Sequence, residues 1–99
     1  MRDRVRYIFW EAVELIWSEE SEDHIARHAV TPEEVHEVVA ERYARVRGRA
    51  GVSLVYGRTR GGRPLLVVLA PTEAGAATVV TARDLTPAER RSVRRKGSR

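Results

Sequence analysis

The stretch WSEESEDHIARHAVTPEEV, from Trp17 to Val35, decides the fold. It predicts the end of a strand, a short helix, a tight corner and the start of a second helix. Ser18 is a suitable N-cap residue, and the acidic residues that follow it suit the positive end of a helix dipole. We therefore predict a first helix from Ser18 to about His28.

The second helix has a stronger start signal. Thr31 provides the cap, Pro32 takes the first helical position, and Glu34 completes a capping box. Val30 and Val35 are spaced for a hydrophobic staple across this start. Apolar residues then recur at helical spacing and predict a buried face, at Val35, Val38, Val39 and Tyr43.

The residues before this stretch divide into two parts. Val13 to Trp17 (VELIW) alternates in hydrophobicity and predicts a short first strand. Residues 1–12 contain an unbroken apolar run from Tyr7 to Trp10. This run fits an extra helix, an added strand or a segment packed on the core, and the sequence leaves the three open.

After Arg42 the hydrophobic period changes from helical to alternating. Four strands are predicted there, at residues 45–47, 52–57, 64–69 and 77–82, with a hairpin turn at Gly61-Gly62. The segment 64–69 is the most apolar, so we expect it at the centre of the sheet. Thr86-Pro87-Ala88-Glu89 repeats the capping-box pattern and predicts a last helix. The order describes one α+β domain over residues 1–99.

Composition limits the possible functions. The chain has no cysteine, which excludes disulfide scaffolds, thiolate zinc sites and thiol catalysis. No apolar run approaches the roughly 20 residues of a membrane helix, and the N-terminus lacks the pattern of a signal peptide. We therefore expect a cytoplasmic protein without membrane association.

Charge is divided unevenly along the chain. Residues 1–42 hold five Arg and eleven Asp or Glu, whereas residues 43–99 hold thirteen Arg or Lys and three Asp or Glu. A basic second half favours a polyanionic partner. Seventeen of the eighteen cationic residues are Arg, which suits bidentate phosphate binding but also follows from a GC-rich genome.

The first predicted helix concentrates the candidate chemistry, because His24, Arg27 and His28 lie on it. A histidine has a pKa near neutrality and is able to transfer protons. Two histidines four residues apart are also common as the polar flank of a packed helix. The same spacing occurs in zinc helices, but the adjacent Glu of that motif is missing, so we expect no metal site.

Several segments together resemble BrnT-type toxins of bacterial type II toxin–antitoxin pairs, over about residues 13–96. No single motif carries the resemblance; the ordered set does. Its members are Trp17, His24-Ile25-x-Arg27-His28, Val30, Glu34-Val35, Tyr56-Gly57-Arg58-Thr59, Leu65–Leu69, Thr81-Ala82-Arg83 and Glu89-Arg90-Arg91.

The resemblance implies a RelE-like fold of order β-α-α-β-β-β(-β)-α, in which a small antiparallel sheet packs against two N-terminal helices. Residues 1–12 have no counterpart in that pattern. The resemblance also implies an endoribonuclease that cuts RNA without a metal or other cofactor and inhibits translation. The implied partner is a BrnA-type antitoxin with a ribbon-helix-helix DNA-binding region, and the expected assembly is a dimer or a hetero-oligomer with the antitoxin. The position of Ala29 is usually Gly in such proteins, which suits a left-handed helix end.

The resemblance places catalysis on Arg27, His28, Arg58 and Arg83. Arg58 and Arg83, near the ends of neighbouring strands, would clamp a phosphate, and His24 or His28 would transfer the proton. Substrate binding then involves base stacking and contacts to the RNA backbone. Its candidate residues are Trp17, His24, Arg90 and Arg91.

Two other functions fit the same residues. One is an inactive module of the same fold that binds a DNA-binding partner as a corepressor. The other is a simple nucleic-acid-binding domain, which the basic second half favours. Trp17 is equally compatible with the core, Arg58 with a solvated hairpin, and the Arg-rich C-terminus with a solvated charge run.

Overall fold

A computed structural model describes residues 14–72 and 75–97. The elements follow the order β-α-α-β-β-β-β-α, as the sequence predicts with the optional strand included. They are β1 (Leu15–Ile16), α1 (Glu19–Arg27), α2 (Pro32–Ala40), β2 (Arg42–Arg47), a 3-10 turn (Arg49–Gly51), β3 (Ser53–Arg58), β4 (Pro64–Pro71), β5 (Ala77–Asp84) and α3 (Pro87–Gly97).

Capping explains where α1 and α2 begin. The Ser18 hydroxyl accepts a hydrogen bond from the backbone N–H of Ser21, and the Ser21 hydroxyl accepts one from Ser18. At α2 the predicted box of Thr31 and Glu34 forms in both directions, at 3.0 and 3.1 Å. Between the helices, Ala29 adopts a left-handed conformation with φ 58°. The predicted corner is therefore confirmed, with an alanine in the conformation that glycine accepts more easily.

The sheet is mixed, in the order β1-β5-β4-β3-β2. Strands β2 to β5 are antiparallel neighbours, as predicted, and β4 lies at the centre. The small antiparallel sheet that the resemblance implies is present, and β1 adds a parallel pair with β5 at its edge. Successive antiparallel pairs lead from β2 through β3 and β4 to β5, so β5 runs opposite to β2 and in the same direction as β1.

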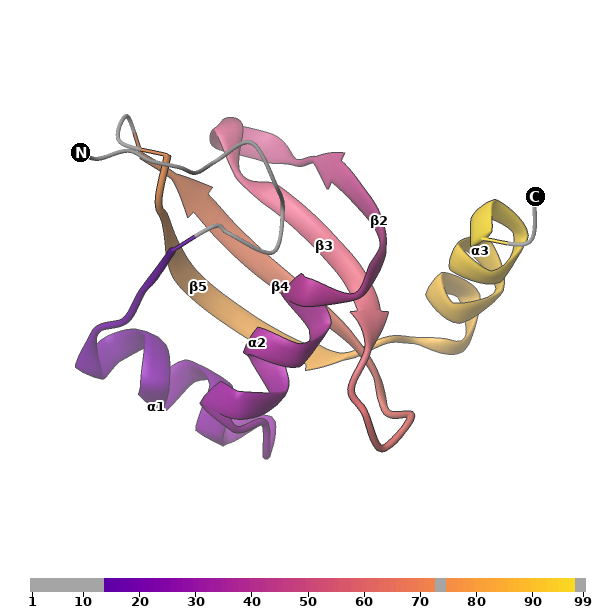
Figure 1. The fold of residues 1–99 in the computed structure, drawn as a ribbon, viewed down its shortest axis with the longest axis horizontal. Helices are drawn as coiled ribbons and strands as arrows, with labels where there is room; N and C mark the ends of the chain where they lie inside the picture. Colours follow the sequence, from indigo (N-terminus) through magenta and orange to yellow (C-terminus); the bar gives the residue numbers. More distant parts are fainter. Residues whose placement is uncertain (1–13, 73–74, 98–99) are drawn as a thin grey trace.

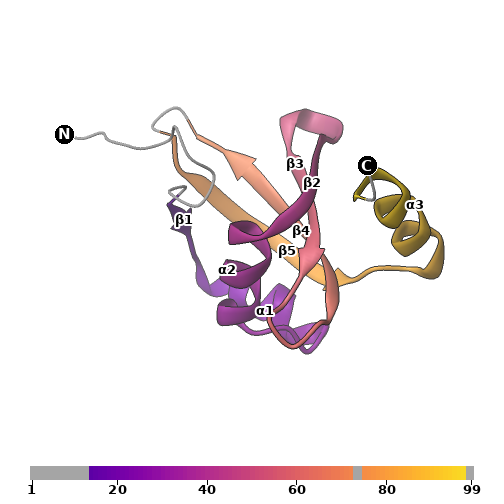
Figure 2. The ribbon, with the colours of Figure 1, turned by 45° about the vertical axis from the view of Figure 1, so that its right-hand side comes forward.

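Helices cover both faces of the sheet (Figures 1 and 2). The α1 and α2 helices cover one face, and α3 lies on the other, reached by a short connection from the end of β5. The main core lies under α1 and α2 and includes Ile25, Val35, Val38, Leu65 and Val67. A smaller cluster under α3 contains Leu66, Leu85 and Val93.

Some predicted boundaries differ from the observed ones. Tyr43 was assigned to the apolar face of the second helix, but α2 ends at Ala40 and Tyr43 belongs to β2. Strand β2 is accordingly longer than predicted. Strand β5 continues beyond Ala82 to Asp84, which places Arg83 inside the sheet.

The alternatives for residues 1–12 lie outside the described residues. No helix in the described part of the chain has the length and apolar character needed to cross a membrane.

Candidate functional site

Arg83 is held in place by α3. Its Nη1 and Nη2 atoms donate to Oε1 and Oε2 of Glu89, each at 2.9 Å, in a bidentate pair. This hydrogen bonding lowers the pKa of Glu89 from 4.5 to about 2 and raises the pKa of Arg83. Glu89 also accepts from the backbone N–H of Thr86 and so caps α3. One carboxylate therefore fixes both the start of the helix and the arginine.

Arg58 and Arg83 lie on the same face and at the same end of the sheet. Side chains alternate along each strand, and Leu66, which is buried in the α3-side cluster, pairs with both Tyr56 and Arg83. Arg58 lies two residues beyond Tyr56 at the end of β3, so it has the same orientation. Its side chain is exposed, and Nη1 lies 3.5 Å from the Gly62 carbonyl oxygen.

The guanidinium of Arg63 donates five hydrogen bonds at this end of the sheet. Its guanidinium donates to both carboxylate oxygens of Asp84, at 2.8 and 3.2 Å. It also donates to the carbonyl oxygens of Ala29 and His28, at 2.8 and 3.0 Å, and to Glu34 at 3.2 Å. The hydrogen bond from Arg63 holds the pKa of Asp84 below its usual range. The α1–α2 corner is thus joined to the ends of β4 and β5.

Arg27 and His28 end the first helix and are both exposed. Arg27 is the last residue of α1, and His28 is its C-cap residue. The charge of His28 contributes to lowering the pKa of Asp84, so the imidazole and this carboxylate are electrostatic neighbours. His28 belongs to the side of the sheet covered by α1 and α2, whereas Arg83 faces α3. The predicted catalytic residues therefore approach the same end of the sheet from its two sides.

Trp17 lies elsewhere. It follows β1, whose Ile16 pairs with Thr78 near the start of β5. Arg83 is at the other end of β5, about 16 Å further along the strand at roughly 3.3 Å per residue. The Trp17 Nε1 atom donates to Nε2 of His36 at 3.2 Å, and the ring packs against the main core. The structure does not bring Trp17 together with Arg83.

His24 lies between these two regions. Its Nδ1 atom is 3.2 Å from the carbonyl oxygen of Val80, and Nε2 is 4.0 Å from Glu20. Val80 lies at the irregularity in β5 pairing, where the register shifts opposite Val68 and Leu69. A contact to this carbonyl gives His24 a packing role against β5.

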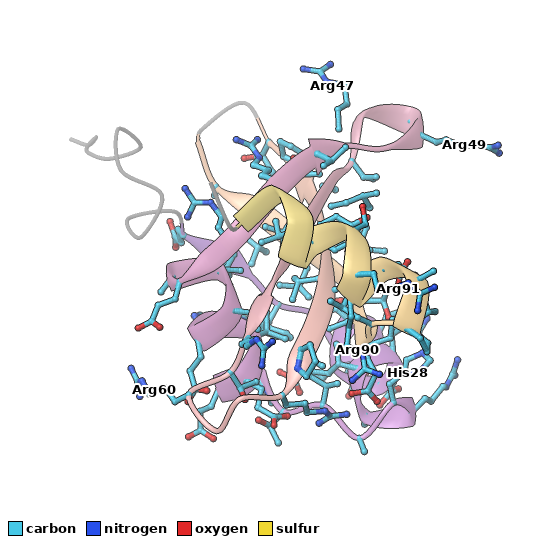
Figure 3. The ribbon with its side chains drawn as sticks, turned by 90° about the vertical axis from the view of Figure 1, so that its right-hand side faces the viewer. His28, Arg47, Arg49, Arg60, Arg90 and Arg91 are labelled. Carbon is cyan, nitrogen blue, oxygen red and sulfur yellow. The ribbon has the colours of Figure 1, made fainter. Side chains whose placement is uncertain are left out.

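The basic side chains are spread over several parts of the molecule (Figure 3). In the view onto α3, Arg90, Arg91 and His28 are all seen at the lower right of the molecule. Arg47 and Arg49 extend from the β2–β3 turn, and Arg60 extends from the β3–β4 hairpin. Arg90 and Arg91 are exposed, as substrate contacts require.

A cavity of about 250 Å³ lies at the opposite end of the sheet from Arg58 and Arg83. Its lining is mainly apolar and includes Val39, Val55, Leu69 and Ala77. None of the nominated residues lines this cavity. Within residues 14–72 and 75–97, no three His, Asp or Glu side chains are grouped to hold one metal ion.

Sequence reasoning missed four residues at this end of the sheet. Arg63 and Asp84 come together through the pairing of Leu65 with Asp84, and this register is not visible in the sequence. Tyr56 was part of the resemblance but received no role, although Tyr56 and Arg83 both pair with Leu66, from the two sides of β4. Glu89 was predicted only as a cap. The capping-box signal at Thr86 was the one available hint that Glu89 points back toward the end of β5.

Neither protein-family models nor curated proteins match this sequence. Among solved structures, the fold is similar to that in the crystal structure of the Brucella abortus ribonuclease toxin BrnT, with a TM-score of 0.60. The two chains are 18% identical, and the match covers 75% of this chain and 97% of the toxin chain. At this identity the likeness concerns the fold alone. The chain shares the α+β fold of BrnT, as the sequence resemblance implied.

Proposed function

We propose that the protein is the toxin of a bacterial type II toxin–antitoxin pair and that it cleaves RNA without a metal ion. The observation that carries the proposal is the fold shared with a ribonuclease toxin, combined with Arg58, Arg83 and His28 at one end of the sheet. A BrnA-like antitoxin with a ribbon-helix-helix region, covering the Arg58 and Arg83 surface, would neutralise it.

The reaction assigns a role to each side chain. His28 accepts the proton of the RNA 2′-hydroxyl, and the 2′-oxygen attacks the adjacent phosphorus. The bond from phosphorus to the 5′-oxygen breaks, which leaves a 2′,3′-cyclic phosphate, and the proton taken up by His28 is returned through solvent water to the departing 5′-oxygen. Arg58 and Arg83 stabilise the negative charge on the phosphoryl oxygens, and Arg27 binds a flanking phosphate. Arginine remains protonated throughout, so it serves as an electrostatic group and not as the base.

Substrate binding to Arg83 requires an exchange of partners. Glu89 now occupies both terminal guanidinium nitrogens, and a phosphate presents two oxygens in a similar arrangement. We expect the RNA phosphate to replace the Glu89 carboxylate, while Arg90 and Arg91 contact the neighbouring backbone. Since those contacts are ionic, RNA affinity should fall as salt concentration rises.

The test is expression in bacteria without the neighbouring antitoxin gene, with growth and RNA integrity as readouts. The wild-type chain should arrest growth and fragment RNA, and Arg83→Ala should lower cleavage by about 100-fold, as loss of one charge-stabilising donor does. Arg60→Ala is the matched control, because Arg60 is exposed and pairs with Glu37 away from Arg83. Normal growth and intact RNA at good soluble expression would overturn the proposal.

A second function has support from one contact. The bidentate pairing of Arg83 with Glu89 suits a catalytically inactive module that binds a DNA-binding partner as a corepressor. That function predicts co-purification with the small partner, no RNA cleavage by the isolated chain, and repression that survives Arg83→Ala. Cleavage by the purified wild-type chain decides against it.

A further inference from the structure

The guanidinium of Arg63 donates hydrogen bonds to carbonyl groups at the C-terminal end of α1. The last carbonyl groups of an α-helix lack partners within the helix. Arg63 donates to the carbonyl oxygen of His28, the C-cap residue of α1, at 3.0 Å and to that of the following residue, Ala29, at 2.8 Å. A positive charge at this end also interacts favourably with the helix dipole. Arg63 is therefore part of the structure of the corner, although it lies 35 residues from His28 in the chain.

The same side chain is fixed from the sheet. Its Nε and Nη2 atoms form a bidentate pair with Asp84, the last residue of β5. Its backbone N–H donates to the hydroxyl of Thr59 at 3.1 Å, and its carbonyl accepts from the Thr59 N–H at 2.9 Å. Thr59 is buried, so the base of the Arg63 side chain starts from a well-fixed hairpin.

These contacts connect the two parts of the candidate site. His28 follows α1 on one side of the sheet, and Arg83, directly before Asp84, faces the other side. The corner between α1 and α2 contains Ala29 at φ 58°, a left-handed conformation that strains an alanine because of its β-carbon. The contacts of Arg63 to the carbonyl groups of His28 and Ala29, on either side of the Ala29 Cα, hold this strained corner in one position.

We propose that Arg63 is a positioning residue, which sets the location of His28 relative to the Arg58 and Arg83 phosphate site. This inference rests on the proposed function, since it concerns the geometry of the same reaction. A planar fork is required, because five donor–acceptor contacts converge on one guanidinium. Lysine has one nitrogen and cannot span Asp84 and both carbonyl oxygens.

The kinetic test compares Arg63→Gln and Arg63→Lys with Arg60→Gln, at a temperature where all remain folded. Arg60 lies in the same hairpin and pairs with Glu37, so it controls for loss of an arginine near the site. With an RNA oligonucleotide, both Arg63 variants should lose about 10- to 100-fold in kcat, with KM within about threefold of wild type. Arg60→Gln should stay within about twofold of wild type in both parameters. A wild-type kcat in Arg63→Gln, or recovery in Arg63→Lys, would overturn the role.

A structural measurement separates this inference from the proposed function. In Arg63→Gln, the His28 ring resonances should shift, and the amides of His28, Ala29 and Val30 should exchange faster with solvent. Neither change should occur in Arg60→Gln. If the wild-type chain does not cleave RNA, the catalytic function fails while this measurement still tests the positioning. Unchanged His28 resonances in Arg63→Gln would overturn the positioning itself. Should Arg63→Gln not fold, Asp84→Asn weakens the same contact and replaces it in both measurements.

Discussion

The two faces of the sheet are stabilised in different ways. Under α1 and α2, twelve buried residues of the described chain form one core cluster, whereas three form the cluster under α3. Tyr56, Leu54 and Val68 are only partly buried beneath α3. The α3 helix is instead held by the Arg83–Glu89 ion pair at its first turn.

Charge follows the same division. The first turn of α1 contains Glu19, Glu20 and Glu22, and that of α2 contains Glu33 and Glu34. The exposed side of α3 presents Arg90 and Arg91. Because the larger core cluster lies under α1 and α2, the acidic face provides most of the stability. On the basic face, α3 covers the smaller cluster beside the candidate site. A change that loosens α3 should affect the site before it affects the fold.

Adjacent leucines of β4 test this comparison most strongly. Leu65 is 0% exposed and faces α1 and α2, and Leu66 is 4% exposed and faces α3. We expect Leu65→Ala to lower the free energy of unfolding by about 3–4 kcal/mol, and Leu66→Ala by about 2 kcal/mol, because the smaller cluster collapses more easily around the lost volume. Urea denaturation measures both values. Equal losses would contradict the difference between the faces.

Acid titration tests the ion pair that holds α3. The pKa of Glu89 is lowered from 4.5 to about 2 by Arg83. A carboxyl with a lowered folded-state pKa contributes stability above its unfolded pKa and loses it as pH falls through the folded value. The pair should therefore contribute fully above pH 4.5 and lose about 1–2 kcal/mol between pH 4.5 and 2, after allowance for solvent screening.

Glu89→Gln provides the control for this titration. Its stability should be lower than that of wild type at pH 7, and the difference should shrink as pH falls toward 2. Amide exchange should locate the loss in α3 and not in α1 or α2. If the two proteins keep the same difference in stability over this range, the pair does not fix the helix.

The corner at Ala29 offers the smallest expected effect. Ala29→Gly should raise the free energy of unfolding by about 0.5–1 kcal/mol, because glycine adopts a positive φ without the cost of a β-carbon. Thermal denaturation with Ala26→Gly as control, in the helical part of α1, should show a decrease there instead. A loss of stability in Ala29→Gly would indicate that its greater freedom in the unfolded chain outweighs the relief of strain.

Local sequence patterns predicted much of this fold. The capping boxes at Thr31 and Thr86, the corner at Ala29 and the central position of β4 depend on residues close together in the chain. Each of these features follows from side-chain hydrogen bonds, backbone strain or apolar period. The order of the elements follows from the same patterns, and the resemblance implied the RelE-like fold.

The candidate site was less predictable because its contacts join distant segments. The pairing of Arg63 with Asp84 depends on strand register, and the pairing of Trp17 with His36 depends on how α2 packs on the sheet. The parallel β1–β5 pair likewise requires knowledge of the return path of the chain. The resemblance nominated Arg58 and Arg83, but it did not show that Glu89 binds Arg83.

The placement of β5 between β1 and β4 also affects how the molecule folds during synthesis. Leu15 pairs with Ala77, so nearly the whole core must emerge before the first strand has a partner. Until then, α1 lacks the strand β5 against which it packs, and such distant pairing makes folding slow. Arg83 and Asp84 end the same strand. A nascent chain therefore completes its main core and assembles its candidate site in one late step.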